Sequence, residues 1–583
     1  MAIFIQFMSK TFVPLEPQKR KLLPTDFIIT NWEQLQPYFE EIVSREIKSK
    51  IDLEKWLSDV SELESVISED ACWRQIKMTC DTNNKSYEEA FTYFCLEIEP
   101  KMKPYGFEIN KKLLSCPFTK ELDSKLYFPY LRNVDNAAKL YREANVQLQA
   151  EASVLAQQYG VISGAMSVEI NDKEYTLQQA VKFLHDSDRV LRESVFRKIA
   201  SRRIIDKDKL NELFNKLLRI RHEIAVNAGF DNYRDYKFRE LGRFDYTKED
   251  CFLFHEAVKE HILPLQRKLV AYKQKRLGLE QMRPWDSDAE PVGTEPLHPF
   301  ESGTELCEKA VVVFEKLNPF FSACLETMQQ MGRLDLESRK GKAPGGYNCP
   351  LAETGVPFIF MNAAGTVGDV ITMMHEGGHA IHSFLSHPLP LASFKEYPME
   401  IAELASMSME LFSMEHWDVF FSDAEELKRA QLEELERVIS VLPWIATIDK
   451  YQHWLYTNPG HTNEQREAAW LTILGEFSTG LTDWSGFEEY QANLWQKQLH
   501  LFEVPFYYIE YGIAQLGAIA MWRQYRQNRQ QALDNYMEAL SQGYTKTLNE
   551  LYNTAGIKFG FAPDYVKELA NFIDPILGTM GIN

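Results

Sequence analysis

The sequence predicts an all-α fold, mainly helical with a small β element near a candidate active site. Over long stretches, apolar residues recur at three- and four-residue steps with Glu and Lys between them, the pattern of amphipathic helices packed side by side. Strand-like patterns are confined to two short segments. No repeat of fixed period is present, which argues against a solenoid.

The helical patterns begin early and define the predicted domains. Between about residues 31 and 202 they include WEQLQPYFEEIVSREI and KLYREANVQLQAEASVLAQQYG, and similar patterns continue beyond. We predict an amino-terminal helical lobe over residues 1–200 and a second domain over residues 201–583, whose catalytic character rests on the motif described below.

Charge and composition exclude several classes of protein. A hydrophobic content of 45% and a charged content of 25% in 583 residues are ordinary for a globular protein with a large core. The formal net charge of -20 argues against nucleic acid and anionic membranes as partners, because both require a basic surface. No stretch approaches the length of about 20 apolar residues that a membrane-spanning helix needs.

The cysteines and the first residues bear on the compartment. The eight cysteines are scattered without a C-x-x-C pair, which suits free thiols in a reducing compartment. The start, MAIFIQFMSKTF, has no basic leader and no small-residue cleavage site, so we do not interpret it as a signal peptide. We therefore expect a cytoplasmic protein.

One short stretch carries the strongest chemical signal. His375, Glu376 and His379 form an H-E-x-x-H pattern within MMHEGGHAIHSF. Helical residues four apart lie one turn above each other, so both imidazoles can converge on one metal ion, which in this motif is Zn2+. Glu376 is rotated by about 100° from His375, so its carboxylate can reach a water in the open position of the metal and act as general base.

The residues around the motif indicate a buried helix with a close neighbour. Thr366 and Asp369, three residues apart, predict a capping box at its start. Gly377 and Gly378 each cost a helix interior about 1 kcal/mol relative to Ala, so a core helix gains nothing from them. We interpret them as positions where another backbone or a ligand approaches closely.

A catalytic zinc ion takes a third protein ligand, for which Glu403 is the candidate. Small residues surround it in EIAELASMSMEL, and they would let this helix pack tightly against the motif helix. Glu410 returns to nearly the same face two turns later and is predicted to accept a hydrogen bond from a ligating imidazole. His382 lies about 10 Å of helix rise beyond His375 and is not expected to be a ligand.

Two segments predict the β elements. MSVEINDKEYT, Met166 to Thr176, alternates around Asn171-Asp172 and predicts a hairpin. PFIFMNA, just ahead of the motif helix, is either a segment that pairs with a substrate backbone as an added strand or an ordinary buried strand. The nearby glycine-rich loop KGKAPGGYNCP lacks the Lys-Ser/Thr spacing of a phosphate loop. The candidate substrate-binding residues are Gly345, Gly346, Phe360, Asn362 and Ala363.

Three blocks of sequence together resemble the oligoendopeptidase F and thimet oligopeptidase family of zinc metallopeptidases. They are GTVGDVITMMHEGGHAIH, EIAELASMSMEL with its two glutamates seven apart, and HLFEVPFYYIEYGIAQLGA from His500 to Ala518. The resemblance extends more loosely from about residue 201 to residue 567. Gly377 departs from the family, where a larger apolar residue is common, and this departure concerns pocket shape and not the chemistry.

The resemblance implies a fold and further site residues. It implies a two-lobed ellipsoid that encloses a deep channel, with one zinc ion at the floor, and that admits short flexible peptides. It also implies a His and Tyr pair that binds the oxyanion, matched here by His500 and by Tyr508 or Tyr511. Several neighbouring tyrosines leave open which hydroxyl points inward.

We therefore predict a zinc-dependent endopeptidase that hydrolyses internal bonds of short unstructured peptides, with Glu376 as the base. One alternative is a dipeptidyl carboxypeptidase or carboxypeptidase on the same fold, which would need a cation such as Arg523 or Arg526 to hold the terminal carboxylate. The other is a non-catalytic helical scaffold that binds peptides. The sequence carries no signal for the oligomeric state.

Overall fold

The computed structural model describes residues 19–582, so the start MAIFIQFMSKTF lies outside the described residues. The chain divides into two compact units, each assembled from three separate ranges. The first unit comprises residues 1–139, 297–431 and 514–559, and the second comprises residues 140–296, 432–513 and 560–583. The boundary near residue 200 stays a prediction.

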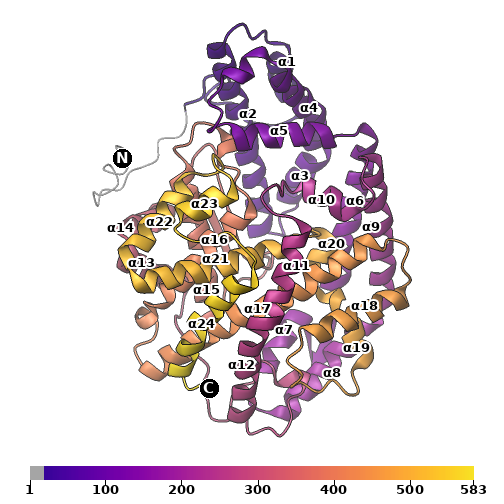
Figure 1. Cartoon of the computed structure of the whole chain (residues 1–583), viewed down its shortest axis with the longest axis vertical. Helices are drawn as coiled ribbons and strands as arrows, with labels where there is room; N and C mark the ends of the chain where they lie inside the picture. The colour runs from indigo at the N-terminus through magenta and orange to yellow at the C-terminus, as the bar shows by residue number, and fades with distance from the viewer. Residues whose placement is uncertain (1–18, 583) are drawn as a thin grey trace. The chain divides into compact units, whose positions relative to one another are not determined.

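Helices dominate both units, which confirms the mainly helical fold (Figure 1). The helices of the first unit are α1 Trp32–Ser44, α2 Lys50–Cys80, α3 Lys85–Tyr93, α4 Glu99–Ser115, α5 Phe128–Leu140, α13 Gly303–Leu317, α14 Pro319–Gln330, α15 Val367–Ser386, α16 Met399–Met414, α22 Arg529–Ser541 and α23 Leu548–Thr554.

The second unit is built in the same way. Its helices are α6 Glu143–Gly164, α7 Leu177–Val181, α8 Arg189–Ile205, α9 Lys207–Asn227, α10 Tyr233–Glu240, α11 Lys248–Ala257, α12 Leu263–Arg276, α18 Asn463–Glu476, α19 Glu488–Ala492, α20 Leu499–Glu503 and α24 Pro563–Thr579. Three helices run from a range of one unit into a range of the other, namely α5, by its last residue Leu140, α17 Ala424–Thr457 and α21 Tyr508–Gln527.

The second unit contains the predicted hairpin. Strands β1 (Ser167–Ile170) and β2 (Lys173–Thr176) pair antiparallel. Asn171 and Asp172 form the two-residue turn, with φ of 51° and 60°. Asn and Asp tolerate this left-handed conformation better than most residues, and it matches the twist of a tight hairpin.

The first unit contains a three-stranded sheet in the order β3-β5-β4. Its strands are β3 Leu334–Glu337, β4 Tyr347–Cys349 and β5 Phe358–Ala363. The central strand β5 runs parallel to β3 and antiparallel to β4. It is apolar along nearly its whole length, as expected for a strand covered on both faces.

Apolar packing fixes this sheet in the first unit. Ile76 of α2 belongs to one buried cluster with Cys349, Phe358 and Phe360. Tyr347 stacks on Phe360, with ring centroids 4.9 Å apart. A larger buried cluster joins α1, α2 and α4 around side chains such as Trp56.

Two broader expectations can be compared with the structure. None of the eight cysteines forms a disulfide. Across residues 19–582, no helix combines the length and the apolar character needed to cross a membrane.

Candidate metal centre

The H-E-x-x-H motif lies on α15, and the predicted capping box is present at the start of this helix. Thr366 Oγ1 accepts a hydrogen bond from the Asp369 N–H, and Asp369 Oδ2 accepts one from the Thr366 N–H at 2.8 Å. The rings of His375 and His379 are neighbours on α15, with centroids 4.8 Å apart. The start of the helix and the pairing of the imidazoles are thus properties of the local sequence.

Helix α15 packs directly against α16 at Gly378. A Cβ atom at this position would lie 2.7 Å from both the Ala405 carbonyl oxygen and Ser406 Cα, closer than real Cβ contacts. Only glycine lets the α16 backbone come this near, which confirms the interpretation of Gly378 as a point of close approach. At Gly377 a Cβ would instead meet the tip of the Phe314 ring, 2.5 Å from Cζ.

This close packing brings Glu403 of α16 to the two histidines. Its Oε2 lies 3.5 Å from His375 Nε2 and 3.8 Å from His379 Nε2. Ligand atoms about 2.1 Å from a tetrahedral zinc ion are about 3.4 Å apart, so these separations fit one ion between the three residues. Two imidazole nitrogens and a carboxylate are also a donor set of catalytic zinc sites.

Glu410 contacts the other ring nitrogen of His375. Its Oε1 lies 2.5 Å from His375 Nδ1, and the residue is 1% exposed. Burial alone would lower the pKa of His375, but the hydrogen bond to Glu410 and the nearby carboxylate charges raise it to about 9. The contact keeps a proton on Nδ1, so Nε2 is the nitrogen that gives up its proton when the ring binds a metal ion.

Glu376 is a buried carboxylate beside these groups. It is 6% exposed, and its Oε2 has no hydrogen-bond partner among residues 19–582. Burial raises the pKa of Glu376 to about 7, opposed by the charge of His375 and assisted by the carboxylates of Glu403 and Glu410. A carboxyl group with such a pKa can both accept and donate a proton near neutral pH.

The other two histidines of α15 have different surroundings. Burial, and then the charge of His375, hold the pKa of His379 well below its usual value, so its ring is a neutral lone-pair donor. His382 is completely buried and stacks on Tyr397, with centroids 3.5 Å apart. His382 is not part of the group formed by His375, His379 and Glu403, and the expectation that it is not a ligand stays a prediction.

The possibility of an added substrate strand beside β5 does not fit the sheet. Phe360 pairs with Asp335 of β3 on one side and with Tyr347 of β4 on the other, so both edges of β5 are occupied. Phe360 and Ala363 are 0% and 8% exposed. The segment is therefore an ordinary buried strand. On the side of β5 toward the glycine-rich loop, the outermost strand of the sheet is β4.

The glycine-rich loop approaches the candidate base. Asn362 Nδ2 donates hydrogen bonds to the carbonyl oxygens of Ala343 and Gly345, at 2.8 and 2.9 Å, and so holds the loop in place. A Cβ at Gly346 would lie 3.9 Å from Glu376 Oε1. The substrate-binding role assigned to the loop glycines, Phe360, Asn362 and Ala363 stays a prediction.

His500, Tyr508 and Tyr511 lie together in the second unit. The centroid of the His500 ring is 4.8 Å from that of Tyr508 and 5.9 Å from that of Tyr511. The two tyrosine rings are 5.6 Å apart. Their role as oxyanion ligands stays a prediction.

Gln498, which the sequence analysis missed, determines the tautomer of His500. The Trp444 indole N–H donates to Gln498 Oε1 at 3.0 Å, so the amide nitrogen of Gln498 faces His500 Nδ1, 2.7 Å away. His500 Nδ1 therefore accepts, and the ring proton resides on Nε2. Burial lowers the pKa of His500 to about 4, so the ring is neutral at neutral pH.

A mainly helical fold that joins an H-E-x-x-H histidine pair to a carboxylate on a second helix is typical of a class of metallopeptidases. The family model described as Peptidase family M3 matches residues 182–571, and that of the Peptidase M3 N-terminal domain matches residues 24–141. The chain belongs to peptidase family M3. Membership supports a peptidase and disfavours a non-catalytic scaffold.

Sequence relatives agree with this family. An oligoendopeptidase F homolog of Borreliella burgdorferi is 21% identical over 533 residues, which cover 87% of each chain. An oligoendopeptidase F homolog of Lactococcus lactis subsp. lactis is 26% identical over 155 residues, which cover 27% of this chain and 25% of the relative.

Solved structures extend the similarity over nearly the whole chain. A structure of PZ peptidase A with inhibitor 2 is 26% identical, has a TM-score of 0.88, and is matched over 95% of this chain and 99% of its own. A putative oligoendopeptidase F from Bacillus anthracis str. Ames is 25% identical, has a TM-score of 0.84, and is matched over 96% and 99%. The resemblance to the oligoendopeptidase F family is thereby confirmed.

Proposed function

We propose that this peptidase is a zinc-dependent endopeptidase that acts on short unstructured peptides. The supporting observation is the convergence of three side chains. Glu403 Oε2 lies 3.5 Å from His375 Nε2 and 3.8 Å from His379 Nε2. These residues would hold one Zn2+ ion and leave a fourth position open. When bound, the ion supplies a Lewis acid that polarises a carbonyl group and lowers the pKa of water toward about 7.

Glu376 is proposed as the proton carrier. Its carboxylate takes a proton from the water that attacks the scissile carbonyl carbon, and then donates this proton to the amine nitrogen as the C–N bond breaks. Its burial and its pKa of about 7 support both roles, because neither protonation state is strongly favoured at neutral pH.

His500 and one tyrosine are proposed to donate hydrogen bonds to the oxyanion, as in the family that the chain resembles. The tautomer of His500, with its proton on Nε2, supports this role, because a neutral donor is available there. Tyr508 interacts with Gln498 and Trp444, the side chains that also orient His500. Removing one such donor costs about 100-fold to 1,000-fold in rate, so Tyr508→Phe and Tyr511→Phe will differ in kcat if only one hydroxyl is used.

Zinc analysis and peptide cleavage test the proposed metal and base together. Glu376→Gln should retain the zinc content of the wild type and lose turnover, whereas His379→Ala should lose one zinc equivalent as well as turnover. The matched control is Glu425→Gln, an exposed residue in the first turn of α17, which should behave as the wild type. Near-native turnover by Glu376→Gln would rule out Glu376 as the base.

The terminal groups of the substrate distinguish an endopeptidase from a carboxypeptidase. Of the two arginines considered for a terminal carboxylate, Arg526 lies 3.4 Å from Glu415, so its charge already has a partner. We expect equal cleavage of one peptide with a free and with an amidated carboxy-terminus, with internal products identified by mass spectrometry. Loss of cleavage on amidation would favour the exopeptidase.

A further inference from the structure

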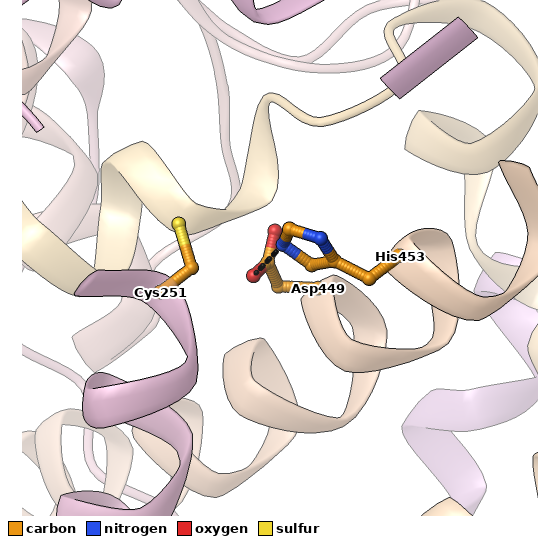
Figure 2. A group of neighbouring side chains, drawn as sticks. All are labelled: Cys251, Asp449 and His453. Carbon is orange, nitrogen blue, oxygen red and sulfur yellow. Dashed lines mark ion pairs between the residues drawn. The ribbon is translucent and has the colours of Figure 1, made fainter. Parts of the chain in front are cut away.

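A second group of metal-binding side chains is buried in the second unit. Cys251 and His255 lie one turn apart on α11, and Asp449 and His453 lie one turn apart on α17. Figure 2 shows Cys251 on one helix, with Asp449 and His453 on another facing it. All four residues are between 0% and 4% exposed.

Three of these side chains bring donor atoms of different kinds together. Cys251 Sγ, an Asp449 carboxylate oxygen and a His453 ring nitrogen all lie within 4.8 Å of one another. His453 Nε2 is 3.2 Å from Asp449 Oδ2. Zinc takes sulfur at about 2.3 Å and nitrogen or oxygen at about 2.1 Å, so small side-chain movements would close these atoms around one ion.

Several polar atoms of the group have no hydrogen bond. His453 Nδ1 and Asp449 Oδ1 have no hydrogen-bond partner within residues 19–582, and the contact of His453 Nε2 among them is with Asp449 Oδ2. The rings of Phe252 and Phe506 flank His453, with centroids 4.9 and 5.5 Å away. Buried polar atoms nearly always have a partner, so unsatisfied atoms on two adjoining side chains point to a missing ligand.

The charge of the group selects the kind of ligand. The ion-pair contacts of Asp449 among the described residues are with His255 and His453, and a buried carboxylate is costly without full compensation. A divalent cation bound by the Asp449 carboxylate and the Cys251 thiolate gives a neutral group. Binding releases the thiol proton of Cys251, because the thiolate is the ligand.

We propose that Cys251, Asp449 and His453 form a second Zn2+ site, distinct from the centre on α15 and α16. His255 is a positioning residue, since its Nε2 lies 2.8 Å from Asp449 Oδ2 and holds the carboxylate in place. The mixed sulfur, nitrogen and oxygen donors suit zinc. Burial leaves no position for a substrate, so the ion is structural and ties α11 to α17.

Cobalt substitution tests this site separately from the first. The proposed first centre offers only nitrogen and oxygen donors, so a thiolate-to-cobalt charge-transfer band in the near ultraviolet reports the second. We expect His379→Ala, in the full-length chain loaded with Co2+ and desalted, to keep one cobalt equivalent and this band. A chain that keeps no cobalt and shows no band would overturn the proposal, whether or not the enzyme is a zinc peptidase.

Variants assign the band to its ligands. In the His379→Ala background, Cys251→Ser should abolish the band, and His453→Gln should reduce cobalt retention at least tenfold. Cys307→Ser is the matched control, because Cys307 is also a buried helical cysteine, on α13. A band that survives Cys251→Ser would overturn the proposal. If Cys251→Ser does not fold, cobalt retention by His379→Ala and by its His453→Gln derivative still decides it.

Discussion

Glu410 Oε1 lies 2.5 Å from Nδ1 of His375, on the opposite side of the ring from Glu403. Glu403 and Glu410 are seven residues apart on α16, about two helical turns, so they share a face of that helix. One carboxylate therefore faces Nε2 while the other holds Nδ1, and a single helix orients the ring from both ends.

Glu410→Gln is expected to weaken metal binding and turnover without removing a ligand. The amide cannot supply the negative charge that fixes the Nδ1 proton, and loss of such a contact typically costs about 10-fold to 100-fold in metal affinity or activity. Competition with a chelator gives the zinc affinity, and kcat/KM gives the turnover. The exposed Glu425→Gln control should keep the zinc affinity of the wild type. If Glu410→Gln keeps it as well, this role is contradicted.

Gly378→Ala is expected to disrupt the centre because it separates two helices. The added Cβ would meet backbone atoms of Ala405 and Ser406 at 2.7 Å, and overpacking of this kind costs about 1–3 kcal/mol. Zinc content and the free energy of unfolding should both fall.

Gly377→Ala is the matched variant for this prediction. There the Cβ meets the end of the buried Phe314 side chain, which can shift at a lower cost than the α16 backbone, and Ala restores about 1 kcal/mol of helix propensity. Urea unfolding and zinc analysis should give Gly378→Ala a clearly lower free energy of unfolding and a lower zinc content than Gly377→Ala. The reverse order would show that the backbone contact is not what brings Glu403 to the histidines.

Gln498→Leu is expected to lower kcat by freeing the tautomer of His500. Without the amide donor, the Nδ1–H form of the ring becomes available, and in that form Nε2 has no proton to donate. We expect a decrease of about 10-fold, smaller than the loss of the donor itself in His500→Ala. A fall in urea stability with unchanged kcat and KM would assign Gln498 a structural role alone.

His500 should make the protein less stable in mild acid. Burial lowers its pKa from 6.5 to about 4, so folding disfavours the protonated ring. Stability is therefore complete above pH 6.5 and falls as the pH drops toward 4, by about 1 kcal/mol at pH 5 after allowance for partial exposure. Urea unfolding at pH 7 and pH 5 measures this loss, which should shrink in His500→Asn. Equal losses in both proteins would contradict it.

Much of the first centre could be predicted because its signals are local. The capping box of Thr366 and Asp369 and the four-residue spacing of His375 and His379 follow from helix geometry within one segment. The choice of Glu403 needed one further inference, that small residues mark a helix contact. The hairpin at Asn171-Asp172 could likewise be predicted from its turn residues.

The sequence by itself determined the helical class, the histidine pair and the family resemblance, because periodicity and motif spacing are short-range properties. Only the tertiary structure decided that β5 is covered on both edges, that Gln498 orients His500, and that Cys251 meets Asp449 and His453. The physical reason is that these contacts join segments whose approach depends on the packing of every element between them. Sequence spacing does not predict such long-range contacts, whereas it does predict which residues lie one helical turn apart.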